Sequence, residues 1–376
     1  MKFKVKREDF LQKLGVVSTA LPVKSPMPVL TGIRITVNHD TLTMIASDTR
    51  ISVRTRMTVE SDSDGDVVLP GKMLYTITKA LSAGYITFAL TENVMKITAD
   101  RGEYSLHVMN AREYPDIVFE GNGAEENVQF SLDGMNFASM VRGVMPCAST
   151  SEKKPILTGV NLKCSDGKVE AIATDSFRLA KKTMVIPEDI KFGITVPKNT
   201  LEVMIANVKE GDIISFEVNR LRMFASVNDV DFVSALMDGN YPDTTKLTTI
   251  QFRDQFKFNK NELMSAIDRI TVLSPSDSGK DRETTYNVVK FNNVGTKEIM
   301  ISVKNASIGD ANEIVPYVEE NEAMLEMNVN GKYLIDALKS INGDVVVMNY
   351  NGSILPFTFT SEVDEDSLQL LLPIRA

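Results

Sequence analysis

The strongest constraint on the fold of this chain is a repeat within its own sequence. Residues 28–57 align without a gap to residues 155–184, an offset of 127, and eight of the thirty aligned positions are identical. The same offset carries the Tyr-Pro-Asp motif at 114–116 onto the one at 241–243. It also relates five further pairs, which are Phe3 and Phe130, Phe10 and Phe137, Pro70 and Pro197, Leu74 and Leu201, and Gly84 and Gly211. Matches at one fixed offset predict tandem copies of one structural unit.

A third copy follows with weaker matches. Asn305 ends an alternating apolar stretch, as Asp48 and Asp175 do in the first two copies. This copy lacks the Pro-x-Leu-Thr-Gly opening of the others and has a polar stretch at 275–285 instead. A Gly- and Glu-rich segment at 120–127 has the composition of a linker. We therefore expect three domains, at residues 1–125, 126–250 and 251–376.

The hydrophobic period within each copy switches between that of a strand and that of a helix. In copy one, the alternation of Phe3 and Val5 predicts a strand, and Phe10, Leu14 and Val17 have helical spacing. Three alternating strands are predicted next, and the cycle then restarts with a strand, a helix at 72–81 and three more strands. The fold class is therefore α+β, and each copy reads βαβββ twice, with two helices and about eight strands.

The composition is that of a globular protein, with 43% hydrophobic and 24% charged residues. Two cysteines in 376 residues argue against a disulfide framework and fit a reducing compartment. The N-terminal sequence lacks the apolar core of a signal peptide, and no window approaches eighteen consecutive apolar residues. We expect a cytoplasmic protein that has no membrane partner.

The search for catalytic and metal-binding patterns is negative. His39 and His107, the two histidines, lie in separate strand-like stretches and form no zinc site or catalytic triad. Four Gly-Lys pairs lack the second glycine of a phosphate-binding loop. Asp62, Asp64 and Asp66 resemble the start of a calcium loop without its bidentate glutamate, and we interpret them as an acidic hairpin loop. The sequence therefore predicts no catalytic residue, no metal and no cofactor.

The net charge of −9 argues against a nucleic-acid partner unless positive charge gathers on one face. The six predicted helices, at 4–14, 72–81, 134–145, 198–209, 260–271 and 332–341, sum to +7 and leave −16 for the rest of the chain. If all six face one way, that face is positive. The charges are sparse and lack interleaved aromatic residues, which favours weak, salt-sensitive contact with phosphates over base readout. The alternative is that short helices simply carry Lys near their ends.

At this level the chain resembles a known family, the bacterial sliding clamps, which are beta subunits of DNA polymerase III. The resemblance extends over the whole chain. It includes the opening MKFKVKREDFLQKL, Pro-Val-Leu at 28–30, ATDSFRLA at 173–180, the Tyr-Pro-Asp motif at 241–243 and Leu-Pro-Ile-Arg at 372–375. It implies three clamp domains per chain and a head-to-tail homodimer that forms a ring of six domains. Twelve helices would line the hole, and the sheets would form the rim.

The resemblance also implies a function without catalysis. Such a ring encircles double-stranded DNA without sequence specificity and tethers the replicative DNA polymerase as a processivity factor. The implied partners are a second copy of the chain, the DNA, the polymerase, an ATP-dependent clamp loader and other proteins that carry a clamp-binding motif. Because a ring is held by topology, weak phosphate contacts allow it to slide, and tethering keeps the polymerase at high effective concentration.

The family has a pocket that captures a short partner peptide. By motif, its members here are Leu157, Thr174, Ser176, Phe177, Arg178, Leu179, Pro242, Lys246, Leu247, Asn330, Tyr333, Ile354, Pro356, Leu370, Leu371, Leu372, Pro373, Ile374 and Arg375. These motifs belong to copies two and three, so we expect one pocket per chain, between those copies. Phe177, Lys246 and Ala376 depart from the residues common in the family and bear on which peptides bind.

Two further sets follow from the resemblance. The residues expected to face DNA are Lys24 in the loop at 21–26, Ser151, Lys153 and Lys154 in the equivalent loop of copy two, and Lys6, Arg7, Lys13, Lys72, Lys79, Lys198 and Lys332. The residues expected at the dimer interface are Tyr104 and Leu106 on the last strand of copy one, and Val272 and Leu273 after a helix of copy three.

Two other classes of protein stay open on the sequence. One is an interaction scaffold of the same fold that does not encircle DNA, which a single-chain mass in solution without retention on DNA would favour. The other is an enzyme built on a repeated α+β scaffold, which requires a cluster of titratable residues that the sequence does not display.

Overall fold

The computed structural model describes residues 1–82, 84–121, 127–187, 189–273, 288–305 and 307–375. The polar stretch at 275–285, much of the expected linker at 120–127 and Ala376 lie outside the described residues. The chain divides into two compact units, the first of Met1–Ala138 and Val196–Asp238, the second of Ser139–Thr195 and Gly239–Ala376. In the described part of the chain, no helix has the length and apolar character needed to cross a membrane.

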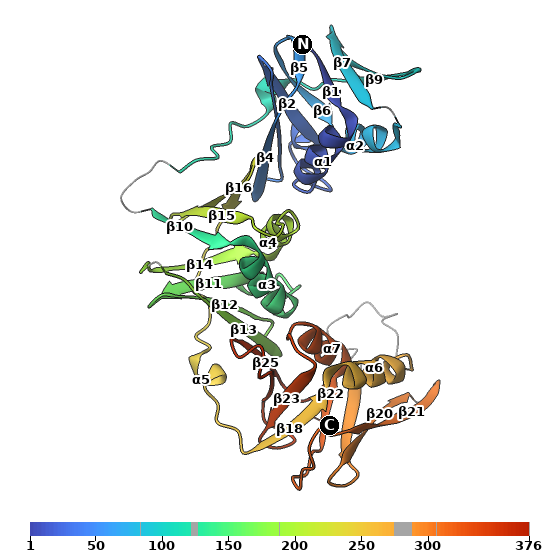
Figure 1. The fold of residues 1–376 in the computed structure, drawn as a ribbon, viewed down its shortest axis with the longest axis vertical. Helices are drawn as coiled ribbons and strands as arrows, with labels where there is room; N and C mark the ends of the chain where they lie inside the picture. The colour runs from blue at the N-terminus through green and yellow to red at the C-terminus, as the bar shows by residue number, and fades with distance from the viewer. Residues whose placement is uncertain (83, 122–126, 188, 274–287, 306, 376) are drawn as a thin grey trace. The chain divides into compact units, whose positions relative to one another are not determined.

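Copy one follows the predicted order of elements (Figure 1). Its first half consists of β1 (Lys2–Lys6), α1 (Arg7–Ser18), β2 (Gly32–Asn38), β3 (Thr41–Ser47) and β4 (Ile51–Thr58). Its second half consists of β6 (Gly65–Pro70), α2 (Gly71–Ala80), β7 (Tyr85–Thr91), β8 (Val94–Ala99) and β9 (Gly102–His107). One short extra strand, β5 (Glu60–Ser63), lies between the halves.

Copies two and three repeat this order. Copy two consists of β10 (Val128–Asp133), α3 (Gly134–Val144), β11 (Gly159–Ser165), β12 (Lys168–Thr174), β13 (Arg178–Val185), β14 (Phe192–Pro197), α4 (Lys198–Ile205), β15 (Ile213–Val218), β16 (Arg222–Val227) and β17 (Val230–Ala235). A helical turn, α5 (Thr245–Thr248), follows. Copy three consists of β18 (Asp254–Asn259), α6 (Lys260–Thr271), β19 (Val288–Asn293), β20 (Glu298–Asn305), β21 (Gly309–Pro316), β22 (Met327–Asn330), α7 (Gly331–Lys339), β23 (Val345–Tyr350), β24 (Phe357–Thr360) and β25 (Ser367–Leu371). The predicted α+β class and the doubled βαβββ order are confirmed.

The repeat extends to the packing of the cores. In copy one, Phe3 of β1 stacks on Phe88 of β7 with ring centroids 4.7 Å apart, and Phe10 of α1 packs on the same ring at 5.1 Å. In copy two, the rings of Phe130, Phe137 and Phe216 are arranged in the same way, at 4.9 and 5.2 Å. Aromatic contacts in these geometries add to the stabilisation from burial. The matching phenylalanines therefore mark equivalent core positions.

Two eight-stranded sheets join successive copies. The first has the strand order β10-β15-β16-β17-β4-β3-β2-β6, so β17 of copy two pairs antiparallel with β4 of copy one. The second has the order β14-β11-β12-β13-β25-β24-β23-β18, so β13 of copy two pairs antiparallel with β25 of copy three. Two smaller sheets, β5-β1-β7-β8-β9 and β21-β20-β19-β22, end in β9 and β21. Neither of these edge strands has an outer partner among the described residues.

Three expectations about charge and turns were wrong. Lys4 and Lys6 belong to β1, because the N-terminal residues pair with β7 and the first helix begins only at Arg7. Lys209 lies beyond α4, which ends at Ile205. The six helices therefore carry +4 in place of +7, with +2 on α2, +1 each on α3 and α7, and balanced charges on the others.

The acidic stretch near residue 64 is not a hairpin loop. β5 pairs with β1 in one sheet, whereas β6 pairs with β2 in another, so the chain crosses between sheets at this point. Asp66 accepts two hydrogen bonds from Arg34, at 3.1 and 2.8 Å. The Asp66 carboxylate therefore links β6 to Arg34 on the neighbouring strand β2.

Candidate peptide-binding site and strand edges

The turn between β12 and β13 forms one wall of the candidate site. Asp175 Oδ1 accepts hydrogen bonds from the backbone N–H groups of Phe177 and Arg178, at 2.9 and 3.0 Å. Thr174 Oγ1 accepts a bond from the Ser176 N–H and donates one to the Arg178 carbonyl oxygen. Ser176 has a φ of 79°, a left-handed conformation that non-glycine residues adopt rarely. The side chains of Thr174 and Asp175 therefore stabilise a tight turn that projects Phe177 outward, where it is 50% exposed.

Beside this turn lies a cavity of 430 Å³ in the second unit. Its lining residues are Lys154, Ile156, Leu157, Thr174, Ser176, Pro242, Asp243, Thr244 and Leu247. The buried Leu157 supplies an apolar floor, whereas Leu247 is 40% exposed. A concave, mostly apolar site with a few polar groups suits a short peptide segment.

The opposite wall is built by the Tyr-Pro-Asp motif. The hydroxyl of Tyr241 accepts a hydrogen bond from the Thr174 N–H at 3.0 Å. Asp243 Oδ1 accepts bonds from the Thr245 N–H at 3.0 Å and the Thr245 hydroxyl at 2.7 Å, which lower the pKa of this carboxyl below its ordinary value of 3.8. The carboxylate thus binds Thr245, the first residue of the helical turn α5, from the position before the N-cap residue Thr244.

Arg178 connects the turn to copy three. Its guanidinium donates to Asp175 Oδ2 at 2.9 Å and to Asp336 Oδ2 at 2.7 Å, and lies 4.1 Å from the centre of the Tyr333 ring. Burial by itself would lower the pKa of the guanidinium, but Cys147 and the Asp336 and Asp175 carboxylates raise it overall. Arg178 therefore binds groups of the protein itself and holds the turn between β12 and β13 next to α7.

The C-terminal run completes the surroundings of the site. Leu370 and Leu371 are buried in β25, which pairs with β13. The Leu372 N–H donates to the Phe177 carbonyl oxygen at 3.0 Å, and the Ile374 N–H donates to the Asn328 carbonyl oxygen at 2.7 Å. The backbone after β25 is thus fixed beside the turn, and Leu372 stays partly exposed there.

The remaining predicted members lie at different distances from solvent. Leu179 and Leu370 belong to a buried cluster with Ile172. Asn330 is the N-cap of α7, where its side chain accepts bonds from the Lys332 and Tyr333 N–H groups. Residues in exposed or partly exposed positions are Lys246, Ile354, Pro356, Pro373 and Arg375.

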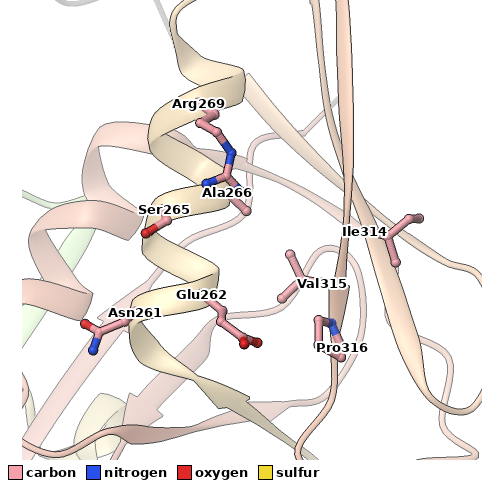
Figure 2. A pocket seen from close by; sticks show the side chains of 8 residues that line it. All are labelled: Asn261, Glu262, Ser265, Ala266, Arg269, Ile314, Val315 and Pro316. Carbon is pink, nitrogen blue, oxygen red and sulfur yellow. The ribbon is translucent and has the colours of Figure 1, made fainter.

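The unpaired edges carry the predicted interface residues. Tyr104 on β9 is exposed and Leu106 is half-buried. Val272, directly after α6, is 78% exposed. Figure 2 shows a second cavity, of 410 Å³, between α6 and β21. It is lined by Asn261, Glu262, Ser265, Ala266, Arg269, Ile314, Val315 and Pro316.

The sequence matches three successive family models of the DNA polymerase III beta subunit. The N-terminal domain matches residues 1–118, the central domain residues 131–243 and the C-terminal domain residues 251–375. The chain belongs to the DNA polymerase III beta subunit family. Its members are non-catalytic sliding clamps, so the chain functions as a DNA sliding clamp and processivity factor in replication. Membership implies DNA and a DNA polymerase as partners.

Individual members of this beta subunit family are similar over the full length. The beta sliding clamp of Bacillus subtilis (strain 168) is 28% identical, with 100% of both chains covered, and that of Staphylococcus aureus (strain Mu50 / ATCC 700699) is 29% identical, with 100% of this chain and 99% of the relative covered. The crystal structure of the Bacillus subtilis DNA polymerase sliding clamp superposes with a TM-score of 0.90 at 28% identity, covering 100% of this chain and 99% of that one.

Basic residues expected to face DNA in a beta subunit fall into two groups here. Lys24, Lys72, Lys79 and Lys332 are exposed, and none of them makes an ion pair within the described part of the chain. The others with recorded partners are Lys6 with Asp9, Lys13 with Asp229, Lys198 with Glu202, and Arg7, which donates to the Thr78 and Lys79 carbonyl oxygens at the end of α2. Ser151 and Lys153 lie in the loop after α3, where the Lys153 N–H donates to Ser151 Oγ.

Lys154, which was also expected to face DNA, lines the cavity beside Leu157. The sequence reasoning also missed Ile156, Asp243 and Thr244 as lining residues. Asp243 stands in the quoted Tyr-Pro-Asp motif, and Ile156 directly precedes Leu157. Neighbouring positions in a short turn share a surface, so adjacency to predicted members was the available signal.

Proposed function

We propose that two copies of this chain join head to tail, β9 of one to β21 of the other, and close a ring around duplex DNA. The support comes from equivalence between the copies. By its place in the repeat, β9 corresponds to β17, and β21 corresponds to β4 and β13. Those equivalents meet at the joints within the chain, whereas β9 and β21 are edges. This single observation carries the proposal, because an unpaired edge strand is a template for pairing with another chain.

The internal joint supplies an expected register for the new one. Phe232 of β17 pairs with Val53 of β4, and Phe232 is fully buried. Successive strand pairings link Phe3 to Phe88, Ile97 and Tyr104, and in the same order they link Phe130 to Phe216, Ala225 and Phe232. Tyr104 is therefore the equivalent of Phe232. Tyr104 would therefore become buried in the dimer.

The partner side of this joint provides space for such side chains. The cavity between α6 and β21 is lined in part by Ile314, Val315 and Pro316 of the edge strand itself (Figure 2), and Val272, directly after α6, is exposed. A contact from β9 to β21, used twice, closes by two-fold symmetry and leaves neither β9 nor β21 unpaired.

The ring would hold DNA by topology. With only +4 on six helices, strong binding to phosphates is not expected, and sliding benefits from that weakness. Lys24, Lys72, Lys79 and Lys332 are the residues that we place on the DNA side. A closed ring cannot thread itself onto a circle, so an ATP-dependent clamp loader is the expected partner for opening it.

The cavity over Leu157 is the proposed site for partner peptides. Polymerase, clamp loader and other proteins would each insert a short segment with apolar anchors, and a few buried side chains would carry most of the affinity. We place the domain boundaries near residues 125 and 250, and the protein in the cytoplasm, where replication takes place and where a reducing environment suits a chain with only two cysteines.

Retention on DNA after loading tests the ring. Protein loaded onto a nicked circle should persist at salt concentrations that abolish binding to short duplexes, since screening weakens phosphate contacts but does not open a ring. Linearising the same circle should release the protein within minutes. Equal loss from circular and linear DNA would show that affinity holds the protein there, and the scaffold alternative would then be favoured.

A further inference from the structure

The segments that follow the two Tyr-Pro-Asp motifs each start at a tyrosine that is hydrogen-bonded to an equivalent strand. The Tyr114 hydroxyl donates to the carbonyl oxygen of Ile45 on β3, at 3.4 Å. The Tyr241 hydroxyl accepts from the N–H of Thr174 on β12, at 3.0 Å. β3 and β12 are equivalent strands of copies one and two. Each tyrosine therefore fixes the beginning of its segment on the outer side of the same strand.

The segments also end on equivalent apolar clusters. Phe119 packs with Ile45 and Val233, and the Arg54 guanidinium lies 4.6 Å from the centre of its ring. Ile250 packs with Ile172 and Leu370 in the second unit. Ile45 and Ile172 are 127 residues apart. Val233 and Leu370 are likewise equivalent, because they pair with Ser52 and Leu179, which are also 127 apart. Phe119 and Ile250 are thus corresponding second anchors.

The lengths between the anchors differ. Copy one uses four residues, 115–118, and copy two uses eight, 242–249. The shorter segment has no helical turn, and Ile117 packs against the cluster of Val29, Leu30 and Val68. The longer segment contains the turn α5, whose first residue, Thr245, donates its backbone N–H to Asp243 Oδ1. Its cavity lies over Leu157, and Leu157 is the equivalent of Leu30.

We propose that the extra length of residues 242–249 is what opens the peptide site in copy two, and that Ile117 fills the corresponding place in copy one. The inference rests on the proposed peptide binding and adds the chemistry of its anchor. Because Ile117, a branched aliphatic residue, packs against the cluster that contains Leu30, the partner residue that packs over Leu157 is a branched aliphatic one of similar size. The segment after the Tyr-Pro-Asp motif thereby determines that the site occurs once per chain.

A shortened connection in the full-length chain tests the proposal. Residues 243–249 are replaced by Asp-Ile-Val, the sequence of copy one at 116–118. The variant should keep the dimer mass and circular dichroism of the parent and lose binding to the replicative polymerase by at least tenfold. The matched control keeps the length and carries Thr248→Ala and Thr249→Ala, and its affinity should stay within about threefold. A folded short variant that binds like the parent overturns the proposal.

A single substitution decides the matter if the short variant does not fold. Thr244 is the equivalent of Ile117 by the 127-residue offset and lines the cavity. Thr244→Ile should lower polymerase binding at least tenfold, whereas Thr244→Ser should leave it within about threefold. Unchanged binding by a folded T244I variant contradicts the inference.

A partner-free readout separates this proposal from the proposed function. The methyl NMR signals of Leu157 should shift when N-acetyl-isoleucine methylamide is added to the parent chain, and shift less with the phenylalanine analogue. The short variant and T244I should show neither shift. If the parent fails to bind polymerase, the proposed function is wrong while this result still tests the cavity. Equal shifts in parent and short variant overturn the role of the connection.

Discussion

The two joints between copies pair their backbones alike but hold their charges differently. At β17·β4, Asp231 binds Arg54 at 2.7 Å and Arg56 at 3.0 Å, and the side chain of Arg56 is 42% exposed. At β13·β25, Lys182 of β13 binds Asp364, which lies just before β25, at 3.0 Å, and their side chains are 10% and 8% exposed. At the first joint, Arg54 and Asp231 are also largely buried, but the network extends to the partly exposed Arg56, whereas the second joint carries a single buried pair.

The repeat therefore keeps strand pairing the same at both joints, while the side chains on the outer surface differ. The hydrogen-bonded ladder needs only backbone groups and therefore recurs at both joints. Side chains on the outer face are free to change. At the first joint, Arg54 of β4 packs on the ring of Phe119, at the end of the segment that follows the first Tyr-Pro-Asp motif. In the second unit, a cavity over Leu157 lies beside the turn that leads into β13.

The largest effect is expected from breaking the buried pair. Asp364→Ala leaves the Lys182 ammonium buried without its carboxylate, which costs about 3 kcal/mol of unfolding free energy. The matched change at the other joint, Asp231→Ala, should cost about 1 kcal/mol, because Arg54 keeps Glu120 and Arg56 reaches water. Urea unfolding followed by circular dichroism measures both, since the chain has no tryptophan. Equal losses would show that burial does not distinguish the joints.

Removing residues 372–376 should affect function at the second joint alone. The deletion takes away the chain that bonds to the Phe177 carbonyl oxygen and to Asn328, but it leaves β25 whole. We expect a folded dimer whose binding to polymerase falls more than tenfold, about 1.4 kcal/mol or above. Surface plasmon resonance against the polymerase gives the value. Full binding by a folded truncation would place the peptide site elsewhere.

The proposed third joint can be weakened without touching the other two. Val272→Ala with Leu273→Ala removes apolar area next to the edge strand β21 and should raise the dimer dissociation constant about fivefold, near 1 kcal/mol. Sedimentation across a dilution series measures the shift. Val294→Ala is the control, since this exposed residue in the turn after β19 is not among those expected at the interface. A dimer mass that does not change on dilution would remove these residues from the interface.

The smallest expected effect concerns the two hydrogen bonds that Thr245, the first residue of α5, donates to Asp243. Hydrogen bonds from Thr245 lower the pKa of Asp243, so their stabilisation is present above pH 3.8 and is lost as pH falls through the depressed value. Thr245→Ala should raise the pKa of Asp243 and fray the turn. NMR titration of the carboxyl in both proteins tests this, with Asp212, whose lowered pKa depends on Asn228, as the internal reference. An unmoved Asp243 titration would mean that Thr245 does not hold it.

Much of the architecture could be predicted from the sequence. The 127-residue offset and the switch of apolar period predicted the α+β class and the doubled βαβββ order, because core phenylalanines such as Phe10 and Phe137 must recur at equivalent depths. The helix at 4–14 was misplaced since Lys4 and Lys6 alternate with Phe3 and Val5 in a strand whose partner, β7, lies about eighty residues away. Local pattern does not reveal such a partner.

The repeated unit could be predicted from the sequence alone, because the same residue types recur at a fixed spacing wherever the same core position recurs. The pairing of strands across copies, and the edges that this pairing leaves open, follow only from the three-dimensional structure. The joints β17·β4 and β13·β25 are formed by hydrogen bonds between backbone groups, which every residue has. No pattern of side chains in the sequence therefore predicts which strands pair there. The cavity over Leu157 likewise depends on the path of residues 242–249, which Asp243 sets through two hydrogen bonds to Thr245. Leu157 and Leu30 occupy equivalent positions in the sequence repeat. Leu157 lines the cavity, whereas Leu30 belongs to a cluster against which Ile117 packs, so the segment after each Tyr-Pro-Asp motif makes the difference.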